Sequence, residues 1–231
     1  MIVIRKKMII IVSIFMIIVL SLVTALSISD SASGVPKPRY TVVVDAGHGG
    51  IDAGASGVKL QARESDINLE LAKKLKKYLE QSAIGVVMTR DGKGGLYGSD
   101  GAGFKMRDMK KRKEIINASE ADLVVSIHLN KYPTSSRRGA QVFFDAESEE
   151  GRVLADCIQK QFNTGINTRA FEPLKGEYYI LKCSPLTSVI AECGFLSNPE
   201  EEALLVTDAY QDKVAYNLFA GIMAYLARGG M

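Results

Sequence analysis

Three apolar runs, each leading to a polar residue at its end, constrain the fold of this chain more than any other feature. The runs and their terminal residues are 41–46 with His48, 121–127 with His128, and 187–191 with Glu192. Short runs rich in β-branched residues are typical of buried strands. Ligands bind at the carboxyl ends of the strands in an open parallel sheet, so the three polar residues can converge if the runs share one sheet.

Helical patterns alternate with these strands. The segment from Glu64 to Leu79 repeats apolar residues at helical spacing, and similar patterns cover residues 149–162 and 214–226. Asn198-Pro199 marks a further helix start, with a capping side chain followed by a proline at the first position. We expect residues 178–181 to form a short strand. The alternation predicts a single α/β domain with a largely parallel, twisted sheet and helices on both faces.

An apolar segment precedes this domain. The run from Met8 to about Ile28 follows the basic cluster Arg5-Lys6-Lys7. Residues 1–28 are typical of a secretory signal peptide or of an uncleaved membrane anchor, and an apolar length of roughly 20 residues favours the anchor. In either case the basic residues stay on the cytoplasmic side of the membrane and the remainder of the chain is exported. Residues 29–39 are expected to be a linker, and residues 40–231 the folded domain.

Composition and charge exclude several classes of protein. The chain of 231 residues is 47% apolar and 24% charged, as in an ordinary globular protein. Two of its three net positive charges lie within residues 1–36, so charge does not indicate a nucleic-acid partner. Cys157, Cys183 and Cys193 lack CxxC spacing and are odd in number, which argues against a disulfide framework and a cysteine-built zinc site. We expect them to be small buried side chains.

The chain contains only two histidines, and both follow strand-like runs. Two imidazoles suit a divalent metal such as zinc, and a catalytic zinc site usually adds a third protein ligand and a water. Glu64 is the best candidate for that ligand, because the positive end of the helix that it opens would keep its carboxylate ionised. The residues alone leave simpler roles open. A histidine at a strand end is often a polar cap, and Glu64 also fits a solvated first-turn acid.

Four motifs taken together resemble a known family. In chain order they are Asp45-Ala-Gly-His48-Gly-Gly, Glu64, Ser126-Ile-His128-Leu-Asn130 and Glu192-Cys-Gly-Phe-Leu-Ser-Asn198. This set resembles the zinc-dependent N-acetylmuramoyl-L-alanine amidases, from about residue 40 to residue 226. Within the family, it is most similar to the short amidases of spore-cortex maturation. Asp52-Ala-Gly54 departs from the family's Asp-Pro-Gly, which we expect to change only the stiffness of the loop.

The resemblance implies a reaction and roles for four residues. His48, Glu64 and His128 would bind one Zn²⁺ ion, which lowers the pKa of its bound water to about 7 and polarises the scissile carbonyl. Glu192 would be the catalytic residue that takes the water's proton and passes it to the departing amine. The apolar residues 189–191 just before Glu192 suggest that Glu192 is buried. Burial would raise the pKa of Glu192 and so help it to accept and return the proton. A fourth metal ligand and a structural salt-bridge partner are the alternative roles for Glu192.

The resemblance also implies a biological setting. The substrate would be peptidoglycan, cut between N-acetylmuramic acid and the L-alanine of the stem peptide, during cortex formation in sporulation, where the product becomes muramic-δ-lactam. The site of action would be extracytoplasmic, such as the forespore intermembrane space, with membrane attachment if the N-terminal segment is uncleaved. An activating partner protein is expected. A non-catalytic wall-binding protein with a structural metal site and a zinc carboxypeptidase acting on stem peptides are the alternatives.

Overall fold

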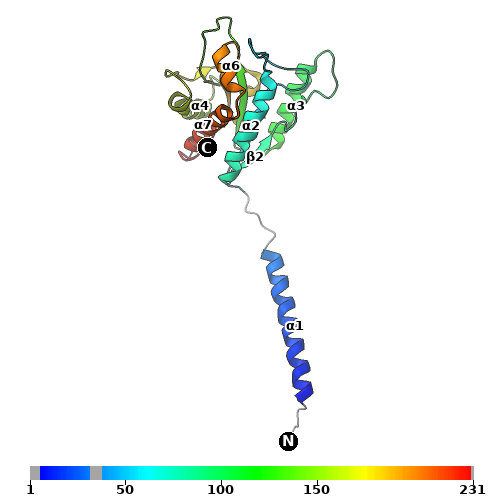
Figure 1. Ribbon diagram of the computed structural model, residues 1–231. Helices are drawn as coiled ribbons and strands as arrows, with labels where there is room; N and C mark the ends of the chain where they lie inside the picture. The colour runs from blue at the N-terminus through cyan, green and yellow to red at the C-terminus, as the bar shows by residue number, and fades with distance from the viewer. Residues whose placement is uncertain (1–5, 32–37, 230–231) are drawn as a thin grey trace. The chain divides into compact units, whose positions relative to one another are not determined.

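The computed structural model describes residues 6–31 and 38–229 (Figure 1). The chain divides into two compact units, Met1–Pro38 and Arg39–Met231. The first unit contains the helix α1 (Lys6–Ser31). Among the described residues, no helix reaches the length and hydropathy that a membrane crossing requires. The division into a signal peptide or anchor, a linker and a folded domain therefore stays a prediction.

The described part of the second unit is built on a six-stranded sheet of order β2-β1-β3-β6-β4-β5. The strands are β1 (Thr41–Ala46), β2 (Gly85–Met88), β3 (Leu123–Asn130), β4 (Gln141–Phe144), β5 (Leu174–Lys175) and β6 (Thr187–Phe195). β1 pairs in parallel with β2 and β3, and β3 pairs in parallel with β6. β4 runs antiparallel to β6. The largely parallel sheet confirms the predicted fold class.

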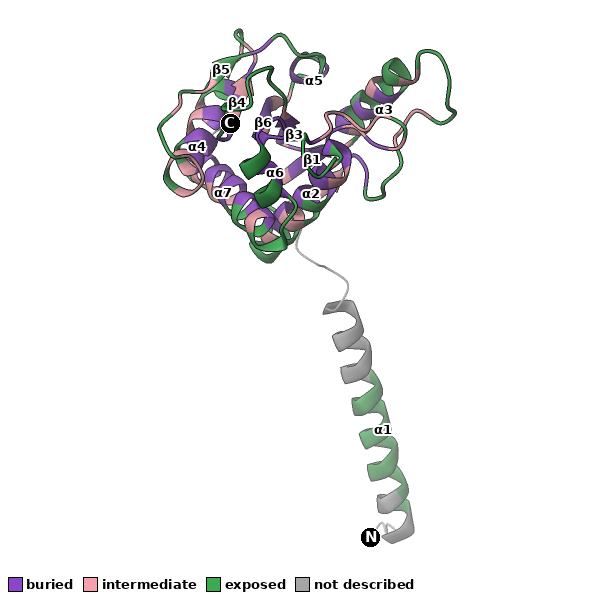
Figure 2. Ribbon diagram, turned by 45° about the horizontal axis from the view of Figure 1, so that its top comes forward, coloured by how far each residue is buried: buried purple, intermediate pink, exposed green. Residues whose placement is uncertain are grey.

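Helices cover both faces of this sheet, as the sequence predicts. On one face, α2 (Glu64–Gln81), α4 (Glu149–Gly165) and α7 (Asp208–Leu226) enclose the larger core. On the other face, α3 (Phe104–Ala118) and the short α5 (Tyr179–Lys182) enclose a smaller one. α6 (Pro199–Leu205) connects β6 to α7. Figure 2 shows the buried residues gathered in the strands and on the inward sides of these helices.

Strand alternation explains how one sheet supplies two cores. Successive side chains of a strand point to opposite faces. Val42 and Val44 of β1 accordingly belong to the larger core, whereas Val43 between them belongs to the smaller one. All three valines are fully buried. A strand buried on both faces reads as a continuous apolar run, which is the pattern that identified these strands.

Local signals set some element boundaries, and packing sets others. The Asn198 side chain accepts hydrogen bonds from the N–H groups of Glu200 and Glu201, which confirms the predicted start of α6. The expected strand over residues 178–181 is wrong, because residues 179–182 form α5. Ile180 and Leu181 of this helix are buried in the smaller core. An apolar run of four residues does not distinguish a helix from a strand, so tertiary packing decided.

Strand register brings the polar residues to one edge of the sheet. His128 of β3 is the direct neighbour of Glu192 in β6. Ala46, the last residue of β1, pairs with Ile127, so His48 follows just beyond the same edge. α2 begins with Glu64, and its backbone N–H donates to the carbonyl of Ala55 in the loop that follows β1.

Candidate metal and catalytic site

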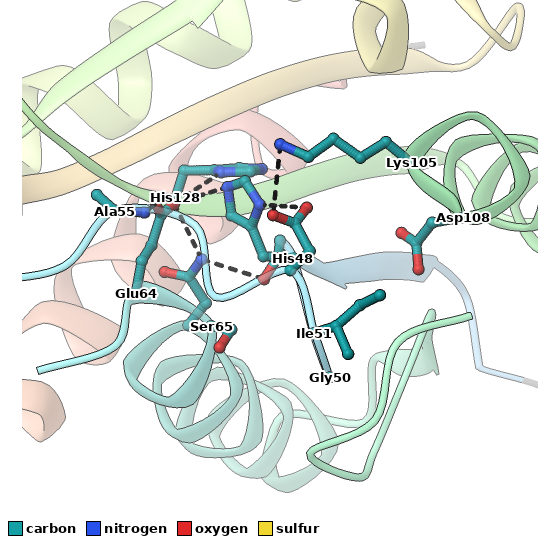
Figure 3. Close-up of polar contacts among 12 residues, drawn as sticks. His48, Gly50, Ile51, Ala55, Glu64, Ser65, Lys105, Asp108 and His128 are labelled. Atoms are coloured by element: carbon teal, nitrogen blue, oxygen red, sulfur yellow. Dashed lines mark hydrogen bonds and ion pairs between the residues drawn. The ribbon is translucent and has the colours of Figure 1, made fainter. Parts of the chain in front are cut away.

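His48, Glu64 and His128 lie together at the carboxyl edge of the sheet (Figure 3). Glu64 Oε1 is 3.2 Å from His48 Nε2 and 3.0 Å from His128 Nδ1. The two imidazole rings meet edge to face, with 4.9 Å between centroids. One ligand atom from each of the three residues lies within 4.8 Å of the others. The structure thus brings the three predicted ligands into one cluster.

The Glu64 carboxylate is held in one position and stays ionised. Its side chain is buried, and its oxygens accept hydrogen bonds from the N–H groups of Ala55 at 2.7 Å and Leu129 at 3.1 Å. The Asn68 amide donates to Oε1 at 3.3 Å. Burial by itself raises the pKa of Glu64, but the hydrogen bonds and charges of the two histidines outweigh it and hold the pKa well below its usual range. Glu64 therefore offers an anionic oxygen ligand.

Asp52 orients the ring of His48. His48 Nδ1 lies 2.9 Å from Asp52 Oδ2, which leaves Nε2 on the side of Glu64. Burial by itself lowers the pKa of His48. The hydrogen bonds and charges of Glu64, and then of Asp52, outweigh burial and raise the pKa to about 9. A carboxylate on the second ring nitrogen is the usual way to fix a metal-ligating histidine. Sequence reasoning did not assign Asp52 to the site, although its position four residues after His48 was a usable signal.

A buried ion pair supports the loop that carries His48. Asp45 accepts hydrogen bonds from Ser126 Oγ and Thr89 Oγ1, each at 2.6 Å, and from Arg112 of α3. Burial opposes the charge of Asp45, but Arg112 and the two hydroxyls outweigh it and lower its pKa to about 2. Arg112 also donates to the carbonyl of His48 at 2.7 Å. His48 has a φ of 62°, a left-handed conformation that needs such support.

Glycine at position 47 permits the close approach of the two histidines. A Cβ built on Gly47 would overlap the His128 ring. Asn68 and Arg90 both donate to the carbonyl of Gly47, at 3.2 Å and 3.0 Å, so the backbone cannot easily move away. Any larger residue would therefore push the His128 ring out of its position beside Glu64.

Glu192 borders the cluster and lines a cavity of about 250 Å³ together with both histidines. Its Oε2 atom is shielded from solvent and has no hydrogen-bond partner among the described residues. Burial raises the pKa of Glu192 to about 7; the nearby histidines oppose this change and Glu64 adds to it. A carboxylate with this pKa and no fixed partner is suited to accepting and returning a proton near neutral pH.

Lys105 was not anticipated from the sequence. It extends from α3 toward the site, with Nζ 3.6 Å from Asp52 Oδ1 (Figure 3). Its side chain is 69% exposed, and it lines the same cavity as Glu192. Lys105 therefore adds a positive charge to the lining of the cavity, next to Asp52.

The donor set fits a zinc ion. Two imidazoles and one carboxylate are among the ligand sets of catalytic zinc sites, in which a fourth position is left open. The charged, immobilised carboxylate and the Asp52 contact on His48 are the supporting interactions that such sites use. The three cysteines are free and buried, and the described cluster contains none of them.

Comparison with known proteins identifies the family of this chain. The model of the N-acetylmuramoyl-L-alanine amidase family matches residues 42–224. The chain is 36% identical over 201 residues to the germination-specific N-acetylmuramoyl-L-alanine amidase of Bacillus subtilis (strain 168), an alignment that covers 85% of this chain and 84% of that protein.

Two solved structures are similar in fold and sequence. One is the CwlD amidase from Clostridioides difficile in complex with the GerS lipoprotein, with a TM-score of 0.79, 37% identity, and coverage of 82% of this chain and 100% of that one. The other is an N-acetylmuramoyl-L-alanine amidase from Clostridium difficile 630, with a TM-score of 0.74, 32% identity, and coverage of 84% and 100%. Because the family match spans nearly the whole second unit, the chain belongs to the N-acetylmuramoyl-L-alanine amidase family and is a peptidoglycan hydrolase of that activity.

Proposed function

We propose that His48, Glu64 and His128 hold a single zinc ion and that Glu192 is the acid–base residue of the amidase reaction. The observation that carries this proposal is the cluster of the three ligand atoms within 4.8 Å of one another, beside a carboxylate with a pKa of about 7. When bound, zinc supplies an activated water and polarisation of the amide carbonyl.

The protein's own residues transfer the proton and position the metal ligands. Ionised Glu192 accepts a proton and later donates it to the amine of L-alanine as that amine departs, since an unprotonated amine is a poor leaving group. Asp52 and Arg112 act as positioning residues, because one contacts the His48 ring and the other its carbonyl. The cavity of about 250 Å³ gives the scissile amide access to the cluster.

We further propose a role in spore-cortex maturation, outside the cytoplasm. Support comes from the similarity to a germination-specific amidase and to CwlD. The apolar N-terminal segment would direct export, as a signal peptide or as a membrane anchor. Expressing the full chain in a sporulating host and fractionating membrane from soluble extracytoplasmic material distinguishes these two forms.

We also propose that this chain acts together with a partner protein. The similar CwlD structure holds the GerS lipoprotein, so a lipoprotein is the kind of partner to seek for this chain. Hydrolysis and zinc content should both be measured with and without a candidate partner. A partner that raises activity at saturating zinc acts on substrate or catalysis, whereas one that raises zinc content acts on the metal site.

Product analysis is the direct test of the reaction. The enzyme is incubated with purified peptidoglycan, with and without added zinc, and new N-terminal L-alanine is detected by amine labelling. The expected result is zinc-dependent appearance of this label, with intact stem peptides in the mass spectrum. Release of free D-alanine without new N-terminal L-alanine would contradict the proposal.

A further inference from the structure

A second cavity, of about 620 Å³, lies between two loops away from the metal cluster. One loop joins β3 to β4, and the other follows α4. The Asn167 side chain ties them together, because it accepts from the N–H of Ala140 at 2.6 Å and donates to the carbonyl of Ala140 at 3.0 Å. The cavity, here called the arginine pocket, is lined by three arginines, three small hydroxyl side chains and one tyrosine: Arg137, Arg138, Arg169, Thr134, Ser136, Thr168 and Tyr132.

Two of the three guanidinium groups that line the arginine pocket stack on aromatic rings. Arg137 stacks over the Tyr132 ring at 4.5 Å, and Arg169 stacks over the Phe171 ring at 4.9 Å. In the described parts of the chain, neither of these two arginines is paired with a carboxylate. Arg138 uses Nη1 to bind Glu200 at 3.1 Å. A planar, oriented guanidinium binds a carboxylate with two parallel hydrogen bonds, so the pocket is suited to an acidic ligand.

The arginine pocket lies at the same edge of the sheet as the metal cluster. Gln141, the first residue of the antiparallel β4, pairs with Glu192. Arg138 precedes Gln141 by three residues, which at roughly 3.3 Å per residue places its backbone within about 10 Å of Gln141. The loop starts from β3 directly after Asn130, and the N–H of Tyr132 donates to Ser197 Oγ at 3.0 Å. An extended peptide of three or four residues could therefore span from Glu192 to the pocket.

We propose that the arginine pocket binds the carboxylates of the stem peptide beyond the scissile amide. This inference rests on the proposed function, because the amide must lie beside Glu192 for the stem to reach the pocket. The stem peptide leads away from its first L-alanine and bears free carboxylates on its later residues. The cavity volume of about 620 Å³ is within the range of pockets for short ligands, and its lining side chains are exposed to solvent.

The test removes charge from either the enzyme or the substrate. The full-length enzyme is compared with the double variant Arg137→Gln, Arg169→Gln, using a muropeptide with free stem carboxylates and the same muropeptide with those carboxylates converted to carboxamides. We expect the variant to raise KM for the acidic muropeptide roughly tenfold with little change in kcat, since hydrogen bonds between charged groups at an exposed site are of modest strength. With the amidated muropeptide, variant and wild type should have the same KM.

A charge-matched control separates this site from general attraction. The double variant Lys77→Gln, Lys160→Gln removes the same charge from two exposed positions on α2 and α4 outside the pocket. An equal rise in KM in this control, or an arginine effect of the same size on both muropeptides, would overturn the proposal. An unchanged KM in the arginine variant would also overturn it, and the pocket would then be tested against an acidic partner protein. Failure of the proposed function looks different, because the wild type would then release no new N-terminal L-alanine from any substrate.

Discussion

Replacing Glu192 by glutamine separates proton transfer from metal binding. Glutamine keeps the size of the side chain and removes its ability to take up a proton. General acid–base residues typically contribute 10²–10⁴-fold to rate, so kcat should fall by about that factor, or about 3–5 kcal/mol in barrier height. Zinc content should stay at the wild-type level, because Glu192 lies outside the cluster of His48, Glu64 and His128.

The same substitution should stabilise the metal-free enzyme in alkaline solution. Burial raises the pKa of Glu192 from its ordinary value of 4.5 to about 7, so the folded state binds this proton more tightly than the unfolded state does. The contribution to stability is complete below the unfolded pKa and is lost as the pH rises through about 7. A shift of roughly 2.5 units at 1.36 kcal/mol per unit gives an upper limit of about 3 kcal/mol. Glutamine avoids this loss because it does not ionise.

Three measurements check these expectations. Amine labelling of new N-terminal L-alanine gives kcat, and elemental analysis gives zinc content. Denaturant unfolding of chelator-treated protein at pH 8 should show Glu192→Gln to be the more stable form, and the difference should vanish near pH 4. The wild-type rate should fall in acid as Glu192 becomes protonated, since the base must be ionised. A near-normal rate in the variant, or loss of zinc from it, refutes the acid–base assignment.

Three other predictions concern the metal ligands and their supports. His48→Ala or His128→Ala should abolish zinc retention and hydrolysis together; dialysis followed by elemental analysis checks this, and retained zinc would contradict it. Asp52→Asn should weaken zinc affinity roughly 10–100-fold, because Asp52 orients the His48 ring. Competition with a chelator measures this, and an unchanged affinity would argue against the orienting role. Arg112→Met should lower the free energy of unfolding by about 3–5 kcal/mol, because it leaves Asp45 buried without its cation. Adding Asp45→Asn should recover part of that loss in denaturant titrations, and simple additivity would show that the two side chains are not coupled.

The candidate site was largely predictable because strand ends carry it. His48 and His128 follow apolar runs that form parallel neighbours in the sheet, and Glu192 lies near the end of a third. In a parallel α/β sheet, helical crossovers return the chain to the same side, so the carboxyl ends of the strands share one edge. The periodicity alone could not assign Glu64, since many helices begin with an acid. The ordered set of motifs made that assignment, and the structure places Glu64 between the two imidazoles.

The contacts of the supporting residues were not predictable in the same way. Asp45 and Arg112 are 67 positions apart, and their pairing depends on how α3 packs against the sheet. Lys105 reaches Asp52 for the same reason. The segment that forms α5 carried a strand-like pattern, and only its burial against the smaller core fixed it as a helix.

The amino-acid sequence by itself determined the order of the strands and helices apart from the short β5 and α5, the residues at the strand ends and the family to which they correspond, because periodicity and motifs are local properties of a chain. Tertiary structure alone decided the reversal of β4 beside β6, the ion pair beneath His48 and the arginine pocket. Each of these depends on side chains from separate elements meeting at distances of a few ångströms. Such meetings are set by the packing of whole helices and loops, whose free energy is spread over many contacts and is not encoded in any single segment.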